Sequence, residues 1–225
     1  MDSVVLKFGG TSVQDAAALR RLVAVVGAEP RRRVVVVSAL ARVTDTLAEI
    51  AMGTVEIAPL LEAGRVPVLG GFVGSTKAGV TTTLGRGGSD YSAALVGAAI
   101  AAREIQIWTD VDGVLTSDPR VVSSAALVPE LTFHEAYDLA RFGAKVLHWG
   151  TLEPAASHDI PVRVLNSRRP GAGGTTIAAT VRRAAPSVVG LAHQSGHALV
   201  CVTRRALASR VLSHLHEMLF EPVHA

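Results

Sequence analysis

Runs of apolar residues alternate with amphipathic or alanine-rich stretches along most of this chain. Short apolar runs, several rich in β-branched residues and typical of buried strands, lie at residues 3–7, 34–37, 66–69, 105–108 and 162–165. Helical patterns lie among them at residues 13–27, 44–51, 89–103 and 133–142. Strands that alternate with helices indicate an α/β fold with a mostly parallel sheet.

The last part of the chain has a different composition. Residues 178–186 are polar and basic and include a proline, and they precede two β-like runs at 188–192 and 198–202 and an amphipathic helix at 206–219. Two strands are too few to close a sheet of their own. We therefore expect this tail to pair with another copy of the chain or to be an incomplete module.

Composition narrows the class of protein. The chain has 225 residues, of which 49% are hydrophobic and 18% charged, which excludes disorder. A net charge of +3 and 4% aromatic residues argue against a nucleic-acid partner. The basic run at residues 31–33 is interpreted as a solvated loop.

The single cysteine and the first residues bear on the compartment. Cys201 cannot form an internal disulfide and lies in an apolar run, which favours a buried structural role. No basic segment precedes the first apolar run, which is far too short to span a membrane. We expect a cytoplasmic protein without a membrane partner.

The first candidate site is a glycine pair directly after the first predicted strand. Lys7 ends that strand, and Gly9 and Gly10 precede a predicted helix. Glycines let backbone N–H groups approach phosphate oxygens, and a lysine supplies positive charge. A plain turn with a helix cap at Thr11 or Ser12 is the alternative interpretation.

A second glycine-rich loop, at residues 81–91, also leads into a helix. It contains Arg86 and Asp90, which suit an amino acid ligand because a guanidinium binds a carboxylate and a carboxylate accepts from an ammonium group. The alternative is a solvated loop in which Ser89 or Asp90 caps the helix.

A third polar loop follows the strand predicted at residues 105–108. The carboxyl edge of such a sheet is where open α/β folds bind ligands. Turn roles are favoured for Asp112 and Asp118, while Arg120 is a candidate phosphate contact.

Four segments, at residues 7–12, 84–90, 108–113 and 142–148, together resemble one family in one order. That family is aspartate kinase, of the amino acid kinase superfamily, and the resemblance covers residues 3 to about 178. It implies a three-layer αβα sandwich in residues 1–178, shortened between about 52 and 56 where the family has a long section. Residues 179–186 would be a linker, and residues 187–225 resemble part of an ACT regulatory module.

The resemblance also implies roles for individual residues. Lys7 resembles the catalytic lysine that stabilises the transferring phosphoryl group, with Gly9 and Gly10 lending backbone donors. Positions that match the family's substrate contacts are Ser38, Thr44, Arg86, Ser89 and Asp90. Positions that match its nucleotide side are Lys7, Thr109, Asp110, Arg120 and Lys145.

The implied reaction moves the γ-phosphoryl group of Mg²⁺-bound ATP onto the side-chain carboxylate of L-aspartate, without a dedicated metal site in the protein. No general base is needed because a carboxylate is already ionised at pH 7. Two alternatives stay open: a nucleotide-binding homologue or regulatory subunit without turnover, and a kinase for another small acceptor. A homodimer formed through the tail is a further expectation.

Overall fold

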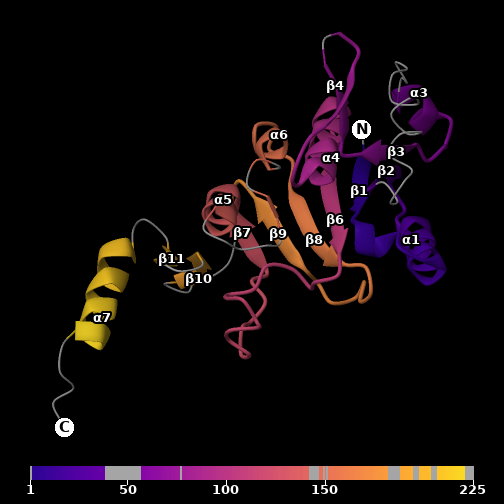
Figure 1. Ribbon diagram of the computed structural model, residues 1–225. Helices are drawn as coiled ribbons and strands as arrows, with labels where there is room; N and C mark the ends of the chain where they lie inside the picture. Colours follow the sequence, from indigo (N-terminus) through magenta and orange to yellow (C-terminus); the bar gives the residue numbers. More distant parts are fainter. Residues whose placement is uncertain are drawn as a thin grey trace.

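A single seven-stranded sheet forms the centre of the molecule (Figure 1). The computed structural model describes residues 2–38, 57–76, 78–141, 147–148, 150, 152–181, 188–194, 198–203 and 207–220. In spatial order the strands are β3 (Val68–Gly71), β2 (Arg32–Ser38), β1 (Ser3–Phe8), β6 (Glu104–Thr109), β8 (Val162–Asn166), β9 (Thr175–Ala178) and β7 (Glu130–Thr132). The first five run parallel, β9 is antiparallel to β8, and β7 is parallel to β9.

Helices cover both faces of the sheet. On one face α1 (Ala16–Ala28) contributes Val25 to a core with Leu6 and Phe8 of β1. The other face is covered by four helices, which lie across the sheet from α1 in Figure 1: α3 (Ile57–Glu62), α4 (Gly88–Ala99), α5 (Phe133–Arg141) and α6 (Glu153–Ala156). The predicted mostly parallel sheet and three-layer arrangement are therefore confirmed.

Strand β1 is buried along its whole length, as expected for a central parallel strand. Successive side chains of a strand point to opposite faces. Val4, Leu6 and Phe8 face α1, so Val5 and Lys7 face the layer of α4. This alternation places the only charged side chain of β1 under the beginning of α4.

Two helices begin with side-chain caps that the sequence supplies. Asp15 precedes α1 and accepts from Ala18 N at 2.7 Å, and this bond holds the pKa of Asp15 below its usual value. At α5, Thr132 and Glu135 bond each other's backbone N–H, at 3.2 and 2.7 Å. These local contacts fix where both helices start.

Some elements were not predicted from the sequence. The hairpin of β4 (Val73–Ser75) and β5 (Thr81–Thr83) was missed because its strands have three residues each and β5 is exposed throughout. Strands β7 and β9 were missed for their shortness as well. The helix predicted at residues 44–51 lies outside the described residues.

The tail contains the predicted two strands and helix. Strands β10 (Val188–Gln194) and β11 (Ala198–Thr203) form an antiparallel hairpin, and α7 (Ala208–Phe220) follows. Val189 and Val202 are buried in the same core as Leu139 of α5, and Leu191 N donates to Thr116 O at 2.7 Å. The hairpin thus packs against the αβα part of the chain, while α7 stands apart from the sheet in Figure 1.

None of the described helices combines the length and the hydropathy that crossing a bilayer requires.

Candidate functional site

The candidate site lies at the carboxyl edge of β1, β2, β3 and β6. A short 3₁₀ helix, η1 (Gly10–Ser12), follows β1, and Gly9 N donates to Trp108 O at 3.2 Å, which ties the loop to the end of β6. Ser12 N and Val13 N then donate to the carbonyls of Gly9 and Gly10. The N–H groups of Gly10 and Thr11 have no acceptor among the described residues, so they are available to a ligand.

The glycines of this loop are not there for packing. A Cβ at Gly10 would meet nothing within 4 Å among the described residues, and one at Gly9 would lie 3.6 Å from Lys7 Nζ. At neither position would the surroundings exclude a side chain. The fold itself therefore does not require glycine at these two positions. Close approach of a ligand to the backbone would require it.

Lys7 reaches across from β1 to the first turn of α4. Its side chain is only 9% exposed, and its ammonium group forms an ion pair with Asp90 Oδ1. Apart from that ammonium group, this buried carboxylate oxygen has no hydrogen-bond partner in the described part of the chain. The sequence placed Lys7 with the phosphoryl group and Asp90 with the amino acid, and the structure puts the two side chains in contact.

The beginning of α4 is packed tightly against the ends of β2 and β3. Ser38 and Ser89 share a hydrogen bond between their hydroxyl oxygens at 2.9 Å. A Cβ at Gly71 would lie 2.9 Å from Ser89 Cα and from Val36 Cγ1, so only glycine fits there. Sequence reasoning missed Gly71, although a Gly-Gly pair at the end of a predicted strand is the signal for such an approach.

Arg86 lies between the β4–β5 hairpin and α4. It is exposed, and no described residue forms a hydrogen bond or ion pair with it. Phe72 fixes the base of the hairpin: it has a positive φ of 79°, its N–H donates to Ser92 Oγ at 3.1 Å, and its carbonyl accepts from Leu84 N at 2.8 Å. The loop that holds Arg86 therefore starts from a fixed anchor.

Ser167, at the end of β8, joins the loops that follow β1 and β6. Its N–H and its hydroxyl both donate to Thr109 O, at 2.8 and 3.0 Å, and its Oγ lies 2.9 Å from Ser12 Oγ. Thr109 and Asp110 are thereby held near the glycine loop. Sequence reasoning missed Ser167 because a lone serine after a strand has no distinctive pattern.

The loop after β6 is held by Asp112. This carboxylate accepts from Asn166 Nδ2 at 2.7 Å and forms an ion pair with Arg169, so it links the ends of β6 and β8. A turn role was favoured for Asp112, and the structure gives it these additional partners.

Arg120, the predicted phosphate contact, is bonded to its near neighbour Asp118. Its Nε and Nη2 donate to the two carboxylate oxygens at 3.0 and 2.6 Å, which raises the pKa of Arg120. The exposed guanidinium of Arg120 is thus already bonded within its own loop, to Asp118. Of the other predicted residues, Thr44 and Lys145 lie outside the described residues.

Within the described residues, no three His, Cys, Asp or Glu side chains gather in a way that could hold a metal ion.

Known proteins are similar to this chain in sequence and in fold. The model of the amino acid kinase family matches residues 52–166, just over half of the chain. Lysine-sensitive aspartokinase 3 of Escherichia coli is 53% identical over 131 residues, which is 58% of this chain and 28% of that protein. Aspartokinase 1, chloroplastic, of Arabidopsis thaliana is 54% identical over 116 residues, 51% of this chain and 20% of that protein. The matched part is thus about a fifth to just over a quarter of these relatives.

Solved structures agree with the fold. E. coli aspartokinase III in complex with aspartate and ADP superposes with a TM-score of 0.72 at 31% identity, covering 85% of this chain and 67% of that one. UMP kinase from Bacillus anthracis, at 15% identity and a TM-score of 0.58, covers 89% of this chain and 98% of that one and shares the fold alone. On the family model and these relatives together, the chain belongs to the amino acid kinase family.

Proposed function

We propose that this chain is an aspartate kinase, which transfers the γ-phosphoryl group of ATP to the β-carboxylate of L-aspartate and forms 4-phospho-L-aspartate. This reaction would be the first step toward lysine, threonine and methionine. The observation that carries the proposal is the contact between the buried Lys7, beside the glycine loop, and Asp90 in the first turn of α4. Its relatives are named aspartokinases, and one of them is described in complex with aspartate and ADP.

The nucleotide would bind over the glycine loop. The N–H groups of Gly10 and Thr11 would donate to its phosphate oxygens, since the N–H of Gly9 is already bonded to Trp108 O. We place Thr109, Asp110, Arg120 and Lys145 on the nucleotide side. Arg120 would have to exchange Asp118 for a phosphate group to contribute there.

The amino acid would bind beside the start of α4. Arg86, without a partner among the described residues, would hold its α-carboxylate with two parallel hydrogen bonds. Asp90 would accept from its ammonium group, and the hydroxyls of Ser38 and Ser89, with Thr44, would complete the pocket. An acceptor with an ammonium group suits Asp90 better than a nucleoside monophosphate does.

Binding of both substrates would redistribute the charges of the Lys7–Asp90 pair. The phosphates would take the ammonium of Lys7 and the substrate ammonium would take Asp90, so neither buried charge is left without a partner. Lys7 is then placed to stabilise the negative charge of the transferring phosphoryl group. Mg²⁺ bound with ATP supplies further neutralisation of the phosphate oxygens.

No proton has to be removed in the transfer step. The attacking β-carboxylate is ionised at neutral pH. Catalysis on this proposal consists of positioning two anions against each other and neutralising the charge that develops between them.

Two further proposals concern the tail and the location. We propose that residues 187–225 are a partial ACT-like element after a linker at 179–186, and that it supports a homodimer. Leu212, Met218 and Leu219 of α7 are each about two-thirds exposed, which is the surface such a contact would bury. A monomer mass by light scattering at high concentration would reject the dimer. The proposed location is the cytoplasm.

The function is tested by trapping the product. The protein is incubated with Mg²⁺, ATP, L-aspartate and hydroxylamine, which converts an acyl phosphate to aspartyl hydroxamate. Hydroxamate that forms with the wild type and is lost in Arg86→Ala supports the proposal. No hydroxamate from folded protein rejects it and favours a nucleotide-binding homologue or a kinase for another small acceptor.

A further inference from the structure

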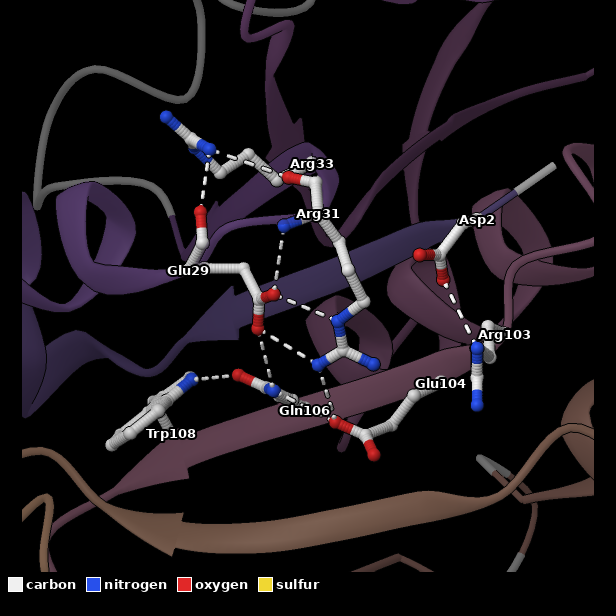
Figure 2. Close-up of polar contacts among 8 residues, drawn as sticks. All are labelled: Asp2, Glu29, Arg31, Arg33, Arg103, Glu104, Gln106 and Trp108. Carbon is white, nitrogen blue, oxygen red and sulfur yellow. Dashed lines mark hydrogen bonds and ion pairs between the residues drawn. The ribbon is translucent and has the colours of Figure 1, made fainter.

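A chain of polar side chains crosses the layer between α1 and the sheet (Figure 2). Glu104, Gln106 and Trp108 alternate along β6, so all three point to the face covered by α1. Glu29 at the end of α1 and Arg31 just before β2 meet them there. The basic run at residues 31–33 is therefore not a solvated loop, and that interpretation is wrong for Arg31.

At one end of this row of polar side chains lies a cluster of ion pairs. The Arg31 guanidinium donates to both oxygens of Glu29, at 2.7 and 2.8 Å, and to Glu104 Oε1 at 3.2 Å. Arg33 Nη1 donates to the backbone carbonyl of Glu29 at 2.6 Å. Glu29 is therefore held from both its side chain and its backbone.

Gln106 connects this cluster by hydrogen bonds to Trp108, at the functional edge of the sheet. Gln106 is 4% exposed, its Nε2 donates to Glu104 at 2.7 Å and to Glu29 at 3.3 Å, and its Oε1 accepts from the indole N–H of Trp108 at 3.0 Å. With donors and acceptor all used, the amide has one orientation, which sets where the indole can lie.

Trp108 connects the network to the glycine loop. Its ring stacks on Phe8, with centroids 6.1 Å apart and an interplanar angle of 12°, and its carbonyl accepts the N–H of Gly9. The residues next to these two, Gly9 and Thr109, belong to the proposed nucleotide site. The indole, its backbone and the loop are thus one connected unit.

Burying such a network is not the simplest way to stabilise this layer. Well-packed apolar side chains of similar volume often stabilise a protein at least as well, whereas a satisfied polar network fixes one arrangement. We propose that Gln106 is a positioning residue, which acts through Trp108 to hold the Gly9–Gly10 loop in its phosphate-binding conformation. This inference rests on the proposed nucleotide binding for its effect on affinity, but not for its effect on the loop.

The test changes the residue at either end of one hydrogen bond. Gln106→Met removes the acceptor, together with the two bonds that Gln106 Nε2 donates to Glu29 and Glu104, and Trp108→Phe removes the donor while it keeps an aromatic ring on Phe8. Arg103→Met is the matched control, because Arg103 directly precedes β6 and its ion pair with Asp2, at 3.5 Å, is exposed (Figure 2). Amide exchange at Gly9 by NMR, the Kd of Mg-ADP, and the KM values for ATP and aspartate are measured with Tm.

Each single change is expected to speed exchange at Gly9 and to weaken Mg-ADP binding by about 3- to 10-fold, the range of one lost hydrogen bond. The KM for aspartate stays unchanged, because Ser89 belongs to α4, which packs on the face of the sheet opposite to that of Trp108. The double variant loses little more Mg-ADP affinity than either single variant, since the bond that both changes remove is the one proposed to act on the loop. Arg103→Met matches the wild type in every readout.

Two results would overturn the inference. The first is Gly9 exchange and Mg-ADP affinity equal to wild type in folded variants, even if Tm falls. The second is additive losses in the double variant. If Gln106→Met does not fold, Trp108→Phe decides alone. A wild type that binds no Mg-ADP rejects the proposed function, and Gly9 exchange still decides whether Gln106 positions the loop.

Discussion

Two acid–base pairs, each with at least one buried member, lie in different parts of this molecule and are partnered in opposite ways. Glu29 and Arg31, behind the sheet, share two hydrogen bonds, and the carboxylate accepts further ones from Gln106 and a backbone N–H. Lys7 and Asp90, at the functional edge, form an ion pair in which Asp90 Oδ1 has no other donor among the described residues.

The difference separates scaffold from site. A carboxylate whose oxygens are both hydrogen-bonded gains nothing by exchanging its partner for a ligand. We therefore assign the Glu29–Arg31 pair to the stability of the fold. A buried pair with unused bonding capacity gains when ligands of both charges arrive, because each member then acquires additional hydrogen bonds. The Lys7–Asp90 pair has this character, which fits a site for an anion and an ammonium group side by side.

The largest expected effect comes from removing the charge at the functional edge. Lys7→Met should lower kcat by about 10²- to 10³-fold, the range seen when one preorganised donor to a developing negative charge is lost. It should also lower Tm, because Asp90 is left buried without its counter-charge. Steady-state hydroxamate assays and thermal unfolding measure both.

A double variant separates the two consequences. Lys7→Met/Asp90→Asn should recover Tm, since neither charge remains, and should stay inactive. Recovery of activity in the double variant, or full activity in the single one, would mean that this pair is only part of the scaffold.

The next largest effects are expected from substituting two glycines at the same edge, one at a time. Gly71→Ala should destabilise the fold by about 1–3 kcal/mol, because its Cβ would overlap the backbone of Ser89. Gly10→Ala, with open space around its Cβ, should leave Tm unchanged and weaken Mg-ADP binding. Urea unfolding and calorimetric titration of both variants test this contrast, and the opposite assignment of effects would contradict it.

The scaffold pair should show a pH signature. The hydrogen bonds from Arg31 hold the pKa of Glu29 below its usual value of 4.5. A lowered pKa stabilises the folded state fully above the unfolded value, and this contribution is lost as the pH falls through the folded value. Glu29→Gln should therefore cost about 1.5–3 kcal/mol at pH 7 and progressively less below pH 4.5.

Denaturant unfolding of the wild type and Glu29→Gln across this pH range gives the result directly. A difference in stability that does not shrink toward acid pH would mean that the charge of Glu29 is not what the network uses.

The smallest effect is expected at the exposed pair of Asp2 and Arg103, whose side chains are 62% and 71% exposed. Arg103→Met should leave Tm within experimental error, because solvent screens such pairs. A drop as large as that of Glu29→Gln would erase the distinction between buried and exposed pairs on which the comparison rests.

The sequence predicted what depends on local pattern. The buried runs of β1 and β6, the turn glycines and the charged residues of the loop before α4 all have recognisable patterns, and the sheet edge follows from them. What it could not predict depends on which side chains meet across the fold. The bond from Ser167 to Thr109 O and the contact of Gln106 with Trp108 join distant or alternating positions that look ordinary in a linear sequence.

Arg120 and Arg31 illustrate this limit from both sides. Arg120 resembled a free phosphate contact, yet Asp118 occupies its guanidinium. Arg31 resembled a solvated charge, yet it completes a partly buried network because Glu29 lies two positions before it and Glu104 comes from another strand. In both cases the partner, rather than the residue type, decides the role.

The central claim, that the Lys7–Asp90 edge is the ligand site, is tested most directly by calorimetric titration of Mg-ADP into the wild type and Lys7→Met. The account predicts saturable one-to-one binding to the wild type and a loss of at least about 10-fold in affinity in folded Lys7→Met. Equal affinity in the two proteins, or no binding to the wild type, would contradict it.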